Sequence, residues 1–198
     1  MYRYEIINYL IEQSGYKTYL EIGIDNPNVC FSKIRVKNKE GVDPAAKCKH
    51  QMTSDAFFEK YTDSSWDIIF IDGLHENEQA ARDIKNSLLR LNKGGTIVVH
   101  DCNPPTKWHT RPHKDYKRGS VWNGTTYQAF VRFAQSDLDL DLVTVDTDWG
   151  CGVIQSAKAV TDLSIPDYEL SWEDFHANRK ELLNLVSVKD FRDKYKRS

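Results

Sequence analysis

The stretch from Trp66 to Asp101 decides the fold, because it contains two apolar runs that are each followed by an aspartate. The first reads WDIIFIDGLHENE over residues 66–78, and the second reads GGTIVVHDCNPP over residues 94–105. Each apolar run is predicted to be a β-strand, and residues 76–91 between them have a helical pattern. A crossover of this length joins parallel strands, whose carboxyl ends lie at the same edge of a sheet.

Four polar side chains follow these two strands. Asp72 and His75 come after the first strand, and His100 and Asp101 come after the second. Neighbouring strands lie about 4.8 Å apart, and open α/β sheets bind their ligands at this edge. We therefore predict that the four side chains line one crevice. Aspartate is also common in turns after strands, so the prediction depends on the pair of strand ends and not on either one alone.

The rest of the chain alternates strand and helix patterns. Further strands are predicted at 17–24, 39–44, 140–145 and 152–155, and further helices at 6–11, 56–61, 125–135 and 172–195. This order predicts an α/β, Rossmann-like, doubly wound and mainly parallel sheet with an antiparallel final pair of strands. We expect a single domain, with its core at 16–156 and a helical extension at 157–198.

Composition limits the classes of function. The 198 residues carry a formal net charge of −2, which disfavours a nucleic-acid binder. No apolar run approaches the roughly 18 residues that cross a bilayer. The four cysteines are widely spaced, without a CxxC pair, which is typical of a reduced protein. We expect a cytoplasmic protein that acts on a small molecule, and composition leaves self-association open.

The first strand indicates which nucleotide the fold could bind. Gly23 is followed by Ile24-Asp25-Asn26-Pro27-Asn28, so the glycine pattern of dinucleotide sites is missing, and no GK[ST] occurs. Asp43 ends the next strand, where an acid can accept hydrogen bonds from a ribose diol. A turn at Asp43-Pro44 is the alternative. The combination favours a nucleoside cofactor without a pyrophosphate, of which S-adenosylmethionine is the common one.

Six segments together resemble a class I S-adenosylmethionine-dependent methyltransferase, and specifically a small family related to sugar and glycan O-methyltransferases. The resemblance covers residues 18–156, and the segments are YLEIGI, GVDP, MTSDAFF, IIFIDGLHENEQAARDI, LNKGGTIVVHDCNPP and VWNGTTYQAF. It implies S-adenosylmethionine as the cofactor. It also implies cofactor-binding roles for a set of residues at the strand ends: Glu21, Gly23, Asp43, Ser54, Asp55 and Asp72.

The first loop departs from the family pattern. Family members commonly carry another glycine after Gly23, where this chain has Asn26-Pro27-Asn28. Asparagine tolerates the left-handed backbone conformation, so the loop can keep its shape. Weaker cofactor binding is the alternative.

The resemblance also implies a divalent metal ion, because related O-methyltransferases bind one at these strand ends. Asp72 and Asp101 would be ligands, with His100 or Asn103 as the third. A histidine ligand suits manganese, iron or zinc better than magnesium. The alternative is metal-free catalysis with His75 or His100 as the general base, beside Asp101.

The loop after Asp101 is basic and aromatic, and we predict that it covers the acceptor. Lys107 and Arg111 would bind anionic groups, and Trp108 and Trp122 would stack on a sugar ring. A solvated surface loop is the alternative. The predicted function is therefore O-methylation of a small sugar-like or anionic acceptor. Two functions compete with this one: a non-catalytic scaffold that keeps the fold, and a nucleic-acid methyltransferase.

Overall fold

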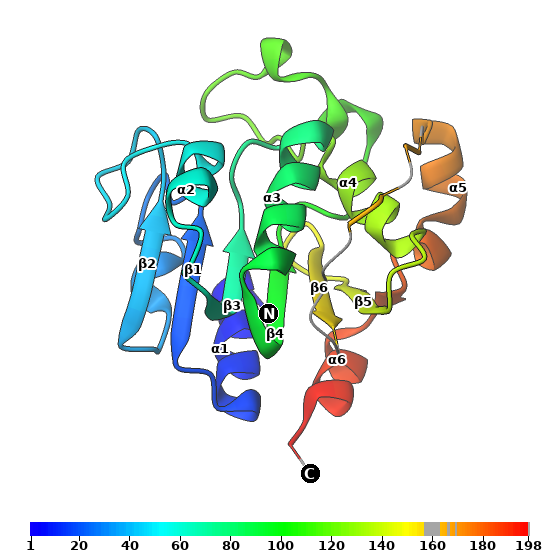
Figure 1. The fold of residues 1–198 in the computed structure, drawn as a ribbon. Coiled ribbons are helices and arrows are strands. Elements are labelled where there is room, and N and C mark those ends of the chain that lie inside the picture. Colours follow the sequence, from blue (N-terminus) through cyan, green and yellow to red (C-terminus); the bar gives the residue numbers. More distant parts are fainter. Residues whose placement is uncertain (157–162, 166, 169, 198) are drawn as a thin grey trace.

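The computed structural model describes residues 1–156, 163–165, 167–168 and 170–197. Within these residues, seven strands form one sheet in the order β2-β1-β3-β4-β6-β5-β7 (Figure 1). The strands are β1 (Thr18–Ile22), β2 (Asn38–Val42), β3 (Trp66–Ile71), β4 (Leu91–Val99), β5 (Leu140–Val145), β6 (Cys151–Ser156) and β7 (Leu185–Val186). The helices are α1 (Arg3–Ser14), α2 (Ser54–Lys60), α3 (Asn77–Leu89), α4 (Thr126–Ala134), α5 (Trp172–Leu182) and α6 (Val188–Tyr195).

The strand–helix–strand unit predicted from the deciding stretch is confirmed. β3 and β4 are parallel neighbours, with Ile69 opposite Ile97 and Ile71 opposite Val99. The crossover helix α3 packs against α4 and β4. Because the two strands end in register, the residues that follow them emerge side by side at one edge of the sheet.

The predicted antiparallel final pair is confirmed as well. β5 and β6 pair antiparallel over their whole length, and β6 pairs antiparallel with β4. β1 is parallel to both β2 and β3, so the half of the sheet that carries the candidate site is parallel. The mainly parallel Rossmann-like architecture is therefore the observed one.

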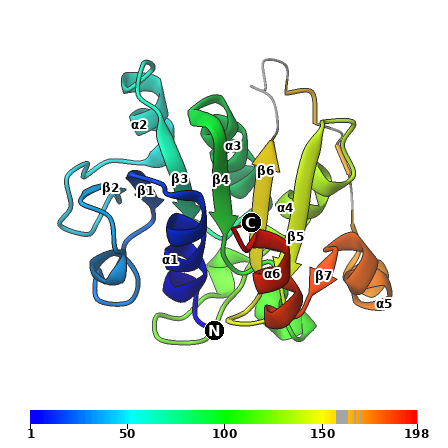
Figure 2. The ribbon, with the colours of Figure 1, turned by 90° about the horizontal axis from the view of Figure 1, so that it is seen from below.

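Apolar side chains alternate between the two faces of the sheet, and helices bury both. Ile68 and Phe70 pack with α1 and α6 on one face, whereas Ile69 and Ile71 pack with α2, α3 and α4 on the other. Figure 2 shows α1 and α6 on one side of the strands and α2, α3 and α4 on the other. Burial on both faces explains why these strands are apolar without interruption.

The tail differs from the single helical stretch predicted over 172–195. It consists of α5, the short strand β7 and α6, and β7 pairs in parallel with β5 at the edge of the sheet. Asn184 breaks the helix because its backbone is left-handed (φ 43°) and its Nδ2 donates to the Leu142 carbonyl at 2.8 Å. Part of the predicted extension, residues 157–162, lies outside the described residues.

Phe175, Leu183 and Phe191 are fully buried, so the tail packs onto the body of the molecule. No helix among the described residues is long and apolar enough to cross a membrane.

Candidate active site

The four side chains that follow β3 and β4 lie together at the carboxyl edge of the sheet. His75 Nδ1 lies 3.0 Å from Asp101 Oδ2, and His75 Nε2 lies 3.4 Å from Asp72 Oδ1. His100 Nδ1 lies 3.1 Å from Asp72 Oδ1 and 3.3 Å from Asp101 Oδ1. We call Asp72, His75, His100 and Asp101 the strand-end cluster.

Asp101 is held in an unfavourable backbone conformation by the loops around it. Its φ is 62°, in the left-handed region that costs a residue other than glycine roughly 1–3 kcal/mol. Asn123 Nδ2 donates to Asp101 Oδ1 at 2.6 Å, and the next segment is fixed because the Asn103 N–H donates to the Trp149 carbonyl at 2.8 Å. These contacts from nearby segments of the same chain turn the Asp101 carboxylate into the crevice.

His100 is almost fully buried, with 3% of its side chain exposed, and both of its ring nitrogens are engaged. Nε2 donates to the Asp148 carbonyl at 2.8 Å, while Nδ1 faces the two carboxylates. Burial acts to lower the pKa of His100, but Asp101 and Asp72 outweigh burial and raise this pKa well above its ordinary value. His100 is therefore an imidazolium that positions both carboxylates.

His75 lies where an acceptor could reach it. Burial would lower the pKa of His75, but Asp101 and Asp72 raise it to about 10. Its ring stacks on the Trp122 indole, with centroids 5.1 Å apart and planes 17° apart. At neutral pH His75 therefore carries a proton between two carboxylates.

One combination of these side chains has the spacing of a metal site. Asp72, His75 and Asp101 each offer a ligand atom, and these atoms lie within 4.8 Å of one another. His100, which the sequence reading placed among the ligands, instead groups with Asp148 and Cys151. Asn103, the other predicted third ligand, bonds Asp146 and Arg179.

Two residues at the site, Arg3 and Asp148, were not predicted from the sequence. Arg3, at the start of α1, contacts Asp72 Oδ2 through Nη1 at 2.7 Å and Asp148 Oδ2 through Nε at 3.0 Å. Burial opposes the charge of Arg3, but Asp72 and Asp148 raise its pKa above the ordinary value. No local pattern could have found this contact, because 69 residues separate Arg3 from Asp72.

A cavity of about 390 Å³ opens beside Asp72, between the ends of β1, β2 and β3, and we call it the donor cavity. Its size lies within the range of small-molecule sites. Its lining combines apolar and polar side chains: Ile22, Gly23, Asp25, Val42, Asp43, Pro44, Thr53, Ser54, Asp72, Gly73, Leu74 and Gln79.

Gly23 is required by the closeness of the two strand ends. Its φ is 85°, and a Cβ placed there would lie 2.2 Å from the Asp72 carbonyl oxygen. In the loop that follows, Asn26 Oδ1 accepts from the Asn28 N–H at 3.0 Å. The left-handed residue is Asp25 (φ 43°) rather than an asparagine. The loop therefore keeps a defined turn without further glycines.

Asp43 lines the donor cavity but bonds the backbone on both sides. Its Oδ2 accepts from the N–H groups of Ile24 and Asp25, each at 3.0 Å. Its Oδ1 accepts from Ala45 at 2.8 Å and Ala46 at 2.7 Å. These bonds lower the pKa of Asp43 although burial would raise it. Because a carboxylate offers about four lone pairs, Asp43 already uses its acceptor capacity to shape the two loops.

Glu21, predicted to bind the cofactor, is not among the residues that line the donor cavity. Its carboxyl is 1% exposed and hydrogen-bonds the Tyr19 hydroxyl on the α1 side of the sheet. Burial raises the pKa of Glu21 to about 8, with a smaller opposing effect from the Tyr19 hydrogen bond. Glu21 is therefore protonated at neutral pH and interacts with the core.

Ser54 and Asp55 lie at the first turn of α2, which Thr53 caps by accepting from the Ala56 N–H at 3.3 Å. Gln79 Nε2 donates to both Ser54 Oγ and Asp55 Oδ1 at 3.1 Å. Ser54 and Gln79 line the donor cavity, whereas Asp55 is not part of its lining.

A second cavity of about 500 Å³ adjoins the first, and we call it the acceptor cavity. The two cavities share Asp25, Asp72 and Gly73. The acceptor cavity is otherwise lined by the rest of the strand-end cluster, by Arg3 of α1 and by residues of two loops: Arg3, His75, His100, Asp101, Tyr116, Gly119, Ser120, Val121, Trp122 and Trp149.

The loop after β4, green at the top of Figure 1, contributes to the acceptor cavity, but with only some of the predicted side chains. Trp122 lines the acceptor cavity, while three other predicted residues do not. Lys107 Nζ pairs with Glu173 at 2.7 Å, and Arg111 stacks over the exposed indole of Trp108, 3.8 Å from its ring centroid. Neither Lys107 nor Arg111 therefore lines the acceptor cavity.

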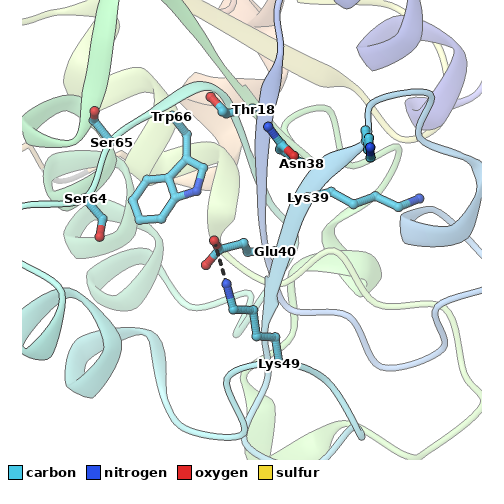
Figure 3. Close-up of a pocket in the computed structure, with 9 residues that line it drawn as sticks. Thr18, Asn38, Lys39, Glu40, Lys49, Ser64, Ser65 and Trp66 are labelled. Carbon is cyan, nitrogen blue, oxygen red and sulfur yellow. Dashed lines mark ion pairs between the residues drawn. The ribbon is translucent and has the colours of Figure 1, made fainter.

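A separate hollow of about 540 Å³ lies at the opposite edge of the sheet. It is formed where β1, β2 and β3 begin, and Figure 3 shows Glu40 in it paired with Lys49 at 2.7 Å. Since open α/β sheets bind ligands at the carboxyl ends of their strands, we place the active site in the other two cavities.

The mixed sheet and its strand order are those of the class I methyltransferase fold. Residues 20–102 match the model of a family described as a methyltransferase domain. This segment runs from β1 to the residue after Asp101 and therefore covers both strand ends. No curated protein sequence matches the chain.

Solved structures share this fold at low identity. An inferred O-methyltransferase from Klebsiella pneumoniae is 12% identical, with a TM-score of 0.55 over 77% of this chain and 78% of that one. The cofactor-bound protein Rv0187 from MTB is 11% identical, with a TM-score of 0.55 over 80% and 82%. The methyltransferase MycE of the mycinamycin biosynthetic pathway, bound to Mg, S-adenosylhomocysteine and mycinamycin VI, is 14% identical, with a TM-score of 0.50 over 81% and 50%.

Proposed function

We propose that this protein is an S-adenosylmethionine-dependent O-methyltransferase that acts on a small, sugar-like acceptor. The observation that carries the proposal is that two cavities meet at Asp72, beside His75 and Asp101. A methyl donor in one cavity and a hydroxyl in the other would face each other at this junction. Holding the two in line is most of what an enzyme must do for a displacement at a methyl group.

The donor cavity suits a nucleoside. It lies at the ends of β1 and β2, within the matched methyltransferase segment, and the MycE structure with the same fold contains S-adenosylhomocysteine. Apolar side chains of Ile22, Val42 and Leu74 can contact the adenine, and polar groups of Ser54 and Gln79 can bond its edge. Asp43 keeps the cavity open by holding the loops on either side.

The strand-end cluster fits a divalent metal ion. Asp72, His75 and Asp101 would hold it, because they supply two carboxylate oxygens and one imidazole nitrogen within the reach of a single ion. This mixed set suits manganese, iron or zinc. Such an ion would act as a Lewis acid that lowers the pKa of the acceptor hydroxyl. His75 is protonated at neutral pH, because its pKa is raised to about 10, so metal binding would release a proton.

The chain's own groups prepare the acceptor for attack. His100 Nδ1 donates to Asp72 Oδ1 and lies 3.3 Å from Asp101 Oδ1, so its charge holds both carboxylates in place. In its neutral form His75 can accept a hydroxyl proton at Nδ1 or Nε2, which lie beside Asp101 and Asp72. The aromatic side chains of Trp122 and Tyr116, whose ring centroids lie 5.0 Å apart, form an apolar part of the acceptor cavity and would help to exclude water from the acceptor.

The lining of the acceptor cavity favours a polyhydroxylated ring over an anion. Trp122, Trp149 and Tyr116 offer aromatic faces, while Asp25 offers a carboxylate that can accept from hydroxyl groups. Of the predicted anion binders, Lys107 pairs with Glu173, and Arg111 donates to the Val121 carbonyl, so neither lines this cavity. Aromatic faces and carboxylates together are well suited to a sugar, whose ring has apolar faces and a polar edge.

Calorimetry and an assay for methyl transfer test the proposal. S-adenosylmethionine and S-adenosylhomocysteine should bind the protein, and a panel of monosaccharides and glycosides should yield one acceptor whose mass increases by a methyl group. Absence of binding at millimolar donor would overturn the proposal. Binding without transfer to any hydroxyl acceptor would support the competing scaffold function, which the glycine-poor loop at Asn26-Pro27-Asn28 favours. The cytoplasmic location remains a prediction.

A further inference from the structure

Arg3 is a charged side chain brought from α1 to the active site. Its side chain is 17% exposed, and Asp148 holds it with both carboxylate oxygens, through Nε at 3.0 Å and Nη2 at 3.2 Å. The backbone N–H of Arg3 also donates to Asp148 Oδ2 at 2.8 Å. The guanidinium is therefore fixed in orientation before any ligand arrives.

Arg3 lies beside the junction of the two cavities. It lines the acceptor cavity, and its Nη1 contacts Asp72, which lines both cavities. Of the described residues that line the two cavities, Arg3 is the only lysine or arginine. The two histidines nearby, His75 and His100, are engaged by the carboxylates of Asp72 and Asp101.

Arg3 still has donors to offer. A guanidinium carries five N–H groups, and the contacts to Asp72 and Asp148 use three of them, one each on Nε, Nη1 and Nη2. Within the described part of the chain, the second N–H of Nη1 and that of Nη2 have no acceptor at hydrogen-bond distance. One N–H on each of these two nitrogens can therefore donate to a further carboxylate.

We propose that Arg3 binds the α-carboxylate of the methyl donor. The inference rests on the proposed function, because it takes S-adenosylmethionine as the ligand. The donor's sulfur must lie at the junction beside Asp72 for the methyl group to reach the acceptor cavity. Its amino acid end starts at that sulfur and finishes in a carboxylate a few bonds away, next to Arg3. Asp25 and Asp72, which line both cavities, would repel this carboxylate, and Arg3 would offset that repulsion.

The competing role for Arg3 is purely structural. In that case it would only neutralise Asp72 and Asp148 and keep the cavities in shape. The two roles differ in their dependence on the ligand. A carboxylate-binding arginine distinguishes ligands that have the carboxylate from ligands that lack it, whereas a structural arginine affects both kinds of ligand equally.

Calorimetry with two ligands separates these roles without an activity measurement. The ligands are S-adenosylhomocysteine and decarboxylated S-adenosylhomocysteine, which differ only in the carboxylate. The variants are Arg3→Met and Arg3→Lys, with Arg192→Met as the control because Arg192 is an exposed residue of α6. The natural protein should bind the complete ligand about 10- to 100-fold more tightly, as expected for hydrogen bonds between charged groups.

Arg3→Met should remove most of this preference by weakening S-adenosylhomocysteine alone, and Arg192→Met should leave it intact. Equal weakening of both ligands, or an unchanged preference, overturns the inference. If Arg3→Met does not fold, Arg3→Lys decides, because it keeps the charge and should reduce the preference while leaving the decarboxylated ligand unchanged. If the natural protein binds neither ligand, the proposed function has failed and the inference fails with it.

Discussion

At the scale of single residues, the site depends on two protonated histidines held between buried carboxylates. His100 and His75 each lie between Asp72 and Asp101, and the two carboxylates raise the pKa of both imidazoles. His100 has no nitrogen left for an acceptor, so its role is to position the carboxylates. The sequence could place the two histidines near the aspartates, but it could not show that His75 is the more exposed of the two.

Asp101 should be essential for methyl transfer and dispensable for donor binding. It lines the acceptor cavity but not the donor cavity, so Asp101→Ala should leave the affinity for S-adenosylhomocysteine unchanged. Turnover should fall roughly 100-fold or more, as for other losses of proton-transfer and charge-stabilising groups. Calorimetry and a coupled assay of S-adenosylhomocysteine release measure the two effects, and normal turnover in the variant contradicts the assignment.

Glu21 should make the stability of the fold depend on pH. Burial raises its pKa from an ordinary 4.5 to about 8, so between these values the folded state keeps a proton that the unfolded state loses. Stability therefore falls as pH rises from 4.5 to 8 and is constant above that range. Glu21→Gln, which keeps a hydrogen-bonding group for Tyr19, should remove this dependence.

Thermal melts of the natural protein and of Glu21→Gln at pH 5 and pH 9 provide the measurement. We expect the variant to be more stable at pH 9 by about 1–4 kcal/mol, with little difference at pH 5. A variant that melts lower than the natural protein at pH 9 would show that the carboxylate form of Glu21 is stabilising.

At the scale of elements, side chains from other parts of the chain join the loops at the strand ends. Asp43 ties the loop after β1 to the segment after β2 with four backbone hydrogen bonds. Arg179 of α5 donates to Asn103 Oδ1 at 2.9 Å and to the Pro104 carbonyl at 3.0 Å, so the tail supports the segment after Asp101. The residue spacing in the sequence predicted the strands and most of the helices, but not these cross-connections.

Asp43→Ala should both destabilise the fold and abolish donor binding. It leaves four N–H groups without their acceptor, which should lower the free energy of unfolding by about 1–3 kcal/mol and lower the Tm by several degrees. Calorimetry should then show no binding of S-adenosylhomocysteine. Asp63→Ala, at an exposed aspartate after α2, is the matched control and should behave like the natural protein. Undiminished donor affinity in Asp43→Ala contradicts the prediction.

At the scale of the whole molecule, the order of strands in the sheet creates the site. β3 and β4 are neighbours in register, and β1 lies on the other side of β3, so one sheet edge carries both the donor cavity and the strand-end cluster. α1 adds Arg3 from one layer, and the turn before β6 adds Asp148. Metal binding also depends on the strand order, because the candidate ligands follow two different strands, β3 and β4.

Removal of divalent metal ions should abolish turnover while leaving donor binding intact. After treatment with EDTA we expect activity to fall at least about 100-fold and to return when manganese, iron, zinc or magnesium is added singly. Metal affinity should increase as pH approaches 10, because the ion must displace the proton of His75. If EDTA-treated protein keeps its activity, and this activity rises with pH towards 10, His75 is the general base instead.

The sequence by itself determined the alternating elements, the parallel strand pair and the meeting of Asp72, His75, His100 and Asp101, because side-chain periodicity and crossover length are local properties. Only the tertiary structure decided which histidine is the more exposed, that Glu21 points into the core, that Asp43 is bonded to backbone on both sides, and that Arg3 reaches the site. These depend on contacts between segments far apart in the chain, and the direction of a side chain at a strand end depends on what packs against it.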